Sequence, residues 1–444
     1  MNRKKIFLPN DLLMDVLPRL PIKTLVRLAC VSKSWYSWLT NPSFITVHNL
    51  ANNNNNLLLI RSRSGDDGKG VHFSLLRCEN QMFYDYANLR LPLNSNNPSL
   101  RIIGICNGVV CLYSSFSRLV DWKELYLWNP SIRKTMALPP LQDPFRSHSP
   151  LMHRIGFGYD ALTDDYKVVR IVYLYERITN GVRSPPEVDI FSLSTGTWRN
   201  ISHLGLPHII DESPQAYVNG AAHWLTHWIN SVKLIVSFHM GDEVFGEIMV
   251  PGCIFVEEEN GFNKKSNVRV VKFQESLSLI VGCNFKYNSS TLNIWVMKEY
   301  GISESWSKRF RIDWSGGRVS SVADFTRKGE VLFGTERGWL VAYDVEAKRH
   351  TKSRYLVAYD QIWNGHGDLW SRNCWPIDSF VADAYTESVV LLRTKAFDAV
   401  PPVSCKESPV LHGEASGAMT RKRRNEEQNQ RRKGKNVKYA WKHI

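Results

Sequence analysis

The chain has 444 residues, of which 43% are hydrophobic and 22% are charged. This composition is ordinary for a folded protein of two or more domains, and it excludes a wholly disordered chain, a collagen-like fibre and a coiled-coil rod. The longest apolar runs, such as 57–60 and 389–392, fall far short of the roughly 20 residues of a membrane span, so we expect no membrane partner.

The net charge of +14 is concentrated at the two ends of the chain. Residues 1–50 hold seven Lys/Arg against two Asp/Glu, and residues 401–444 hold eleven against four. The remaining 350 residues hold 38 against 36. Because phosphate binding needs clustered basic side chains on a folded surface, nucleic acid is not the expected partner of this nearly neutral body.

The eight cysteines are scattered, without a CxxC pair, which favours reduced core residues over a disulfide framework. The basic start, MNRKK, is not followed by the apolar stretch of a secretory signal. We therefore expect a reducing compartment, the cytoplasm and/or the nucleus.

The first region, residues 6–48, has the periodicity of helices. One helical face collects the apolar side chains of Leu12, Leu13, Val16, Leu17 and Leu20. Pro9 suits a first helical turn, whereas Pro18 should end the helix near residue 17.

Two further short helices are predicted, one over 24–29 and one after a cap at Ser32 that aligns Trp35, Trp38 and Leu39. Three helices in about 40 residues make a very small core. Several large apolar side chains would stay exposed unless a partner covered them.

Residues 49–56, which include five consecutive asparagines, are predicted to be a linker. From 57 to 400 the pattern changes to short strands separated by turn residues. Five units each combine a hairpin with a following strand pair, and the pairs begin at 125, 188, 234, 292 and 340.

The spacings of 46–63 residues are close to the roughly 50 of a kelch-type propeller blade. Two half-units remain, an outer strand pair over 57–93 and a hairpin over 379–392. Joining them would give a sixth blade and close the ring, which removes exposed sheet edges. Six blades are favoured, with seven blades or an irregular double sheet as alternatives.

The sequence resembles two known domains. Residues 8–35 carry the Leu8-Pro9 start, the Leu20-Pro21 pair and the ending Val31-x-Lys33-x-Trp35, in the register of an F-box. The later phrases resemble the F-box-associated domain of plant F-box proteins: CNGVVCL at 106–112, WNPSIR at 128–133, GFGYD at 156–160, DYKVV at 165–169, VNGAAHW at 218–224 and ESVVLL at 387–392.

The resemblance implies a substrate-recognition subunit of an SCF-type cullin-RING ubiquitin ligase. Its F-box would dock a Skp-family adaptor, and through it the cullin and RING subunits, while the β domain captures a target for ubiquitination and degradation. Pro18 departs from the family pattern, in which a helix-compatible residue is commoner at this position. The residues that would face the adaptor or shape that surface are Leu8, Pro9, Leu12, Leu17, Leu20, Pro21, Leu25, Val31 and Trp35.

Isolated matches to catalytic motifs have structural explanations that we favour. Gly156-x-Gly158-x-x-Ala161 matches a nucleotide fingerprint but is followed by a predicted strand instead of a helix. His223 and His227 share no HExxH pattern, and Ser131-x-x-Lys134 has no second motif. We therefore expect no enzyme, no cofactor and no metal; a propeller hydrolase is an alternative.

Residues 401–444 are predicted to be a disordered basic tail. Two clusters in it resemble a bipartite nuclear localisation signal, which would fit acidic grooves of an import receptor. The alternative for the tail is a solvated extension without a localisation signal. The alternative for the protein is a nuclear or nucleic-acid-associated binding protein that uses the basic tail. Nothing in the sequence selects a target protein. The clusters are Arg421, Lys422, Arg423, Arg424 and Arg431, Arg432, Lys433, Lys435.

Overall fold

The fold is taken from a computed structural model. All of the elements below belong to a single unit that spans residues 1–399. The structure describes residues 10–52, 56–63, 71–79, 82–89, 91, 100–115, 123–140, 150–176, 181–182, 185–211, 215–226, 234–254, 267–285, 289–335, 338–355 and 380–392.

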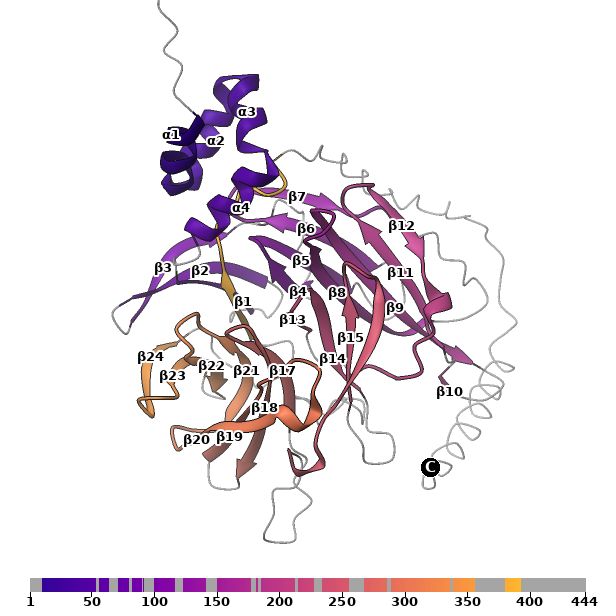
Figure 1. Ribbon diagram of the computed structural model, residues 1–444. Coiled ribbons are helices and arrows are strands. Elements are labelled where there is room, and N and C mark those ends of the chain that lie inside the picture. Colours follow the sequence, from indigo (N-terminus) through magenta and orange to yellow (C-terminus); the bar gives the residue numbers. More distant parts are fainter. Residues whose placement is uncertain are drawn as a thin grey trace, which may run out of the picture. The chain divides into compact units, whose positions relative to one another are not determined.

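Four helices, followed by blades of β-sheet, make up the described part of the chain (Figure 1). The helices form a helical head, the name used below for residues 10–52. None of the helices within the described ranges has the length and hydropathy that a bilayer crossing requires. The head consists of α1 (Asn10–Val16), the 3-10 turn η1 (Leu17–Arg19), α2 (Ile22–Val31), α3 (Lys33–Leu39) and α4 (Pro42–Ala51).

Two features of the head confirm the sequence prediction. α1 ends at Val16, and Pro18 lies in the 3-10 turn that follows, since proline cannot continue an α-helix. Ser32 caps α3, because its side chain accepts a hydrogen bond from the backbone N–H of Trp35 at 3.2 Å.

The head contains one helix more than the sequence predicted. Asn41 caps α4 by accepting a hydrogen bond from Ser43 N at 2.9 Å, and Pro42 takes the first helical position. α4 continues to residue 51, into the segment predicted as a linker. Asn52 ends it and donates a hydrogen bond to the carbonyl oxygen of Pro18 at 2.9 Å.

Within the described ranges, six antiparallel sheets form the blades of the propeller, which confirms the favoured blade count. All five predicted hairpins and the five strand pairs after them are present. The blades are, in order: blade 1, β4 (Leu100–Cys106), β5 (Val109–Ser115), β6 (Lys123–Asn129) and β7 (Lys134–Ala137); blade 2, β8 (Pro150–Asp160), β9 (Asp165–Glu176), β10 (Gly181–Val182), β11 (Glu187–Ser192) and β12 (Thr197–Asn200); blade 3, β13 (Ala216–Val218), β14 (Ala221–Leu225), β15 (Leu234–His239) and β16 (Val244–Met249); blade 4, β17 (Asn267–Phe273), β18 (Ser276–Phe285), β19 (Ser289–Met297) and β20 (Trp306–Trp314); blade 5, β21 (Val319–Phe325), β22 (Val331–Thr335), β23 (Trp339–Asp344) and β24 (Arg349–Tyr355); blade 6, β25 (Phe380–Tyr385), β1 (Leu57–Arg63), β2 (Val71–Glu79) and β3 (Met82–Leu89). Short 3-10 turns are η2 (Ser202–Leu204), η3 (Gly252–Ile254) and η4 (Ser303–Ser305).

Blade 6 joins the two ends of the β region, as predicted, but its strands are divided differently. β25 alone comes from the C-terminal side and pairs with β1, so that residues 57–89 supply three strands instead of an outer pair (Figure 1). The physical reason is the run from Leu57 to Ile60, whose four side chains are all buried. A strand that is buried on both faces is typical of the interior of a sheet. β1 accordingly lies between β2 and β25, and β25 pairs with the edge of β1 that β2 leaves open.

Neighbouring blades are joined by arginine side chains that donate to backbone carbonyl groups of the next blade. Arg154 Nε donates to Ile210 O at 3.0 Å, next to blade 3, and Arg61 Nε donates to Leu100 O at 2.5 Å, from blade 6 to blade 1. Arg269 makes the equivalent bond from blade 4 to blade 5. These bonds to buried carbonyl oxygens help to hold three of the blade boundaries together.

Candidate functional site

The helical head has a small core of its own. Its fully buried side chains come from the turn η1 and from α2, α3 and α4, and one further residue, Val389, comes from the other end of the described chain. The core residues are Leu17, Ile22, Leu25, Ala29, Leu39, Phe44 and Val389.

Large apolar side chains remain exposed on the head although its core is closed. Leu12 and Val16 of α1 are 51% and 54% exposed, and Val31 at the end of α2 is 70% exposed. Several exposed large apolar side chains on so small a domain are typical of a surface that a partner covers.

The predicted adaptor-facing residues differ in how far they are buried. Leu12, Pro21 and Val31 are exposed, whereas Leu17 and Leu25 are buried and shape the surface from beneath. Leu20 and Trp35 are half-buried against the core, and Leu8 and Pro9 lie outside the described residues.

A loop that the sequence predicts to be part of a hairpin joins the head to the propeller. We call residues 386–392 the junction loop. Val389 is buried in the head's core, and the hydroxyl of Tyr36 in α3 donates to the carbonyl oxygen of Leu392 at 3.2 Å. Val390 and Leu391 pack in the core between blades 1 and 2. The same short loop is therefore part of two hydrophobic cores.

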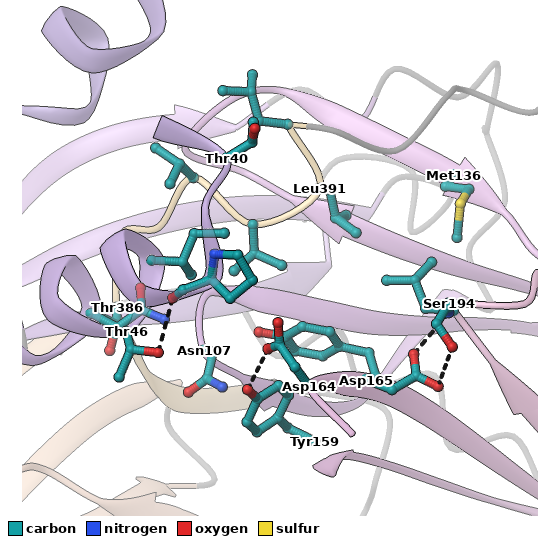
Figure 2. Close-up of a pocket in the computed structure, with 18 of the residues that line it drawn as sticks. Thr40, Thr46, Asn107, Met136, Tyr159, Asp164, Asp165, Ser194, Thr386 and Leu391 are labelled. Atoms are coloured by element: carbon teal, nitrogen blue, oxygen red, sulfur yellow. Dashed lines mark hydrogen bonds between the residues drawn. The ribbon is translucent and has the colours of Figure 1, made fainter. Parts of the chain in front are cut away.

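A cavity of 830 Å³ lies where α4, the junction loop and blades 1 and 2 meet (Figure 2). We call it the junction pocket. α4 contributes Thr46, Asn49 and Leu50, and the turns of blades 1 and 2 contribute the facing side. Its volume is within the range of ligand-binding pockets. The residues from the blades include Asn107, Met136, Tyr159, Asp164, Asp165, Tyr166, Leu193, Ser194, Thr195 and Gly196.

Two adjacent carboxylates of the junction pocket are held by neutral donors. The hydroxyl of Tyr159 donates to Asp164 Oδ1 at 2.5 Å. Asp165 accepts from the backbone N–H and the hydroxyl of Ser194, at 2.8 and 3.0 Å, and from the hydroxyl of Ser192. Figure 2 shows Asp164 bound to Tyr159 and Asp165 bound to Ser194. The adjacent acids were not recognised from the sequence, where they only mark a hairpin turn.

The isolated motif matches have structural roles. Gly158 lies in β8, where an added Cβ would come within 2.2 Å of the Tyr217 ring, so the glycine permits close packing of two blades. Burial lowers the pKa of His223 to about 4, and its Nε2 lies 2.8 Å from the hydroxyl of Tyr300. Ser131 occupies the turn between β6 and β7, and His227 lies outside the described residues.

The cysteine side chains that the structure describes include buried and exposed ones. Cys78, Cys106 and Cys111 are buried, as predicted, while Cys30 and Cys253 are exposed. Burial raises the pKa of the Cys106 thiol to about 12, so it stays protonated and unreactive. No group of three or more His, Cys, Asp or Glu side chains within the described ranges is placed to hold a metal ion. The tail predicted over 401–444, with its two basic clusters, lies outside them.

The comparisons with known proteins agree with the observed architecture. Residues 7–46 match the F-box domain, and residues 56–362 match the F-box associated beta propeller domain. F-box protein At3g07870 of Arabidopsis thaliana is 30% identical over 375 residues, which cover 76% of this chain and 85% of that protein. F-box protein CPR1 of the same plant is 26% identical over 380 residues, covering 78% of this chain and 84% of that protein. The chain thus belongs to the family of F-box proteins with an F-box-associated β-propeller domain.

Proposed function

We propose that this protein is a substrate-recognition subunit of an SCF-type cullin-RING ubiquitin ligase. The helical head docks a Skp-family adaptor, and through it the cullin and RING subunits. The propeller binds a target protein, which is then ubiquitinated and degraded. The protein itself acts as a receptor: it raises the local concentration of target lysines near the ubiquitin-loaded enzyme.

The exposed apolar surface of the head is the observation that carries the proposal. Leu12, Val16 and Val31 are more than half exposed above a core that is already closed. A standard interface buries about 800 Å² on each partner, and a few central apolar anchors supply most of its binding energy. We assign contact roles to Leu12, Pro21 and Val31 together with Leu8 and Pro9, and supporting roles to Leu17 and Leu25.

The junction loop supports a receptor role because it couples the two functional parts. Val389 packs in the head's core, and its neighbour Val390 packs in the propeller's core. A target bound to the propeller would then be held in a defined position relative to the adaptor. A defined position favours transfer of ubiquitin to a limited set of target lysines.

The docking proposal is tested by co-purification of the full chain with a Skp-family adaptor. We expect Leu12→Asp with Val31→Asp to weaken adaptor binding by roughly 100-fold or more, because an interface would then bury unpaired charges. The thermal unfolding midpoint should not change, since both side chains are exposed.

The matched control is Val244→Asp, which adds a charge at an exposed valine of blade 3. Adaptor binding should be unaffected by it. Undiminished binding by the double variant, or equal loss in the control, contradicts docking through the head.

We infer residence in the cytoplasm and/or the nucleus, with the two basic clusters of the tail as an import signal. A reporter fused to residues 415–444 should collect in the nucleus, because an extended basic segment fits acidic grooves. Arg421 to Arg424 changed together to Ala should reduce the accumulation. An evenly distributed reporter would reject the import signal.

A further inference from the structure

The charge of the junction pocket is opposite to that of the chain as a whole. The chain carries a net charge of +14, yet among the described residues the only charged side chains that line the pocket are Asp164 and Asp165. Charge complementarity therefore favours a cationic occupant.

Neither carboxylate has an ion-pair partner in the described part of the chain. Asp165 is only 4% exposed, and its hydrogen-bond donors are the two serines named above. Asp164 is exposed, with one hydrogen bond from Tyr159. A cation entering from solvent would add the opposite charge that these neutral donors do not supply, and hydrogen bonds between charged groups are the strong ones.

Apolar side chains accompany the acids. Leu50 of α4 lines the pocket and is 68% exposed. Ile45 and Leu193 add apolar surface inside. A single small cation would leave this surface in water, whereas a peptide with apolar side chains beside its basic one would cover it.

We propose that the junction pocket binds an extended segment of the target protein in which a lysine or arginine is flanked by apolar residues. This rests on the proposed receptor function and names the chemistry that the receptor recognises. The basic side chain reaches Asp164 and Asp165, and the apolar neighbours pack on Leu50 and Leu193. The segment would contact helix α4 and the propeller at once, so target binding and the head–propeller junction would stabilise each other.

The test is a screen of a random nonapeptide library on the purified full chain. We expect the retained peptides to be enriched in Lys or Arg next to Leu, Ile, Val, Phe or Met. Asp164→Asn should weaken binding of the selected peptides by about 10-fold, since it removes a charge from the pocket. Asparagine keeps the acceptor for Tyr159 and tolerates the left-handed backbone at this position, where φ is 53°.

The matched control is Asp344→Asn in blade 5, which is not one of the residues that line the pocket. Asp344 also accepts backbone hydrogen bonds in a hairpin turn, from the N–H groups of Glu346 and Ala347, and asparagine can keep them. Peptide binding should be the same as for the natural chain. No enrichment of basic residues, or enrichment that Asp164→Asn leaves unchanged, overturns the inference. Arginine amide competing as well as a selected peptide would also overturn it, in favour of a small-molecule cation site.

Adaptor co-purification, measured on the same preparations, separates this inference from the proposed function. Asp164→Asn should bind the adaptor normally. If the adaptor binds but the library shows no basic preference, the pocket inference fails alone. If the adaptor does not bind the natural chain, the receptor function fails, while the library still reports on the pocket.

Discussion

The side-chain nitrogen of Asn129 lies 2.9 Å from the carbonyl oxygen of Ser388, although 259 residues separate the two in the chain. The same nitrogen donates to Val390 O at 2.8 Å. Its side-chain oxygen accepts from the backbone N–H of Ser131 at 2.9 Å. One buried amide at the end of β6 therefore holds the junction loop against blade 1, and with it the position of Val389 in the head.

Replacing this amide should destabilise the whole unit. We expect Asn129→Ala to lower the free energy of unfolding by roughly 2–4 kcal/mol, because two buried carbonyl groups lose their donor. Urea unfolding of the full chain measures it. The control, Asn88→Ala on the exposed side of β3, should change stability by less than about 0.5 kcal/mol. Equal effects would show that the junction does not depend on Asn129.

The glycine of β8 should be intolerant of even one methyl group. Gly158→Ala places a Cβ within 2.2 Å of the Tyr217 ring, whose hydroxyl is fixed by a hydrogen bond from Tyr159 N at 3.1 Å. We expect a loss of roughly 1–3 kcal/mol from overpacking, measured by thermal unfolding. Gly252→Ala meets no atom within 4 Å and should be nearly neutral. A neutral Gly158→Ala would contradict the packing role assigned to this glycine.

Blades 2 and 3 share a buried ion pair that should control acid stability. Lys167 Nζ lies 2.9 Å from Asp160 Oδ2 and 2.9 Å from Glu243 Oε1. Burial alone would raise the pKa of Asp160, but hydrogen bonds from Thr163 and Lys167 outweigh it and lower that pKa to about 2. This folded pKa is below the ordinary 3.8, so the stabilisation is complete above about pH 4 and is lost as the pH falls through 2.

Lys167→Met should therefore cost roughly 3–5 kcal/mol at neutral pH, because Asp160 is left buried without its partner. The difference from the natural chain should shrink near pH 3, where the orphaned carboxylate takes up a proton. Urea midpoints at the two pH values measure this. Lys272→Met breaks an exposed pair with Glu275 and should cost less than about 1 kcal/mol. If Lys167→Met lowers the free energy of unfolding equally at both pH values, the ion pair does not account for the acid sensitivity.

The helical head should lose stability in mild acid. His48 of α4 is fully buried, and burial lowers its pKa from 6.5 to about 4. The unfolded chain therefore takes up a proton between pH 6.5 and 4 while the folded head does not, which reduces stability by roughly 3 kcal/mol over that range. His48→Leu should flatten this part of the pH dependence in thermal unfolding. The exposed His203→Leu should leave it unchanged.

Short-range chemistry made much of the fold predictable. Pro18 and Ser32 mark helix boundaries within a few residues of themselves, and the structure confirms both. Asn107 and Gly108 have φ values of 48° and 76°, which suit the tight turn between β4 and β5 that an Asn-Gly pair favours. A helix start is also signalled for α4, by the capping residue Asn41 and by Pro42 after it. The apolar pattern that follows is less regular, so the sequence did not predict this helix.

The strand composition of blade 6 and the burial of individual leucines could be learned only from the structure. Leu12 and Leu25 are the same residue type in neighbouring helices, yet one is exposed and the other fully buried. A periodic pattern shows which side of a helix is apolar but not how much of that side its own domain covers. The junction pocket could not be predicted from the sequence either, because its acidic residues come from a blade turn and its opposite wall comes from α4.

The amino-acid sequence by itself determined the family, the helical head and the order of hairpins, because turns, caps and apolar periodicity act between residues a few positions apart. Only the tertiary structure decided which apolar side chains of the head stay exposed, how the two ends of the β region share a blade, and that Asp164 and Asp165 line one pocket with helix α4. Each of these depends on contacts between segments far apart in the chain, and no local pattern encodes such contacts.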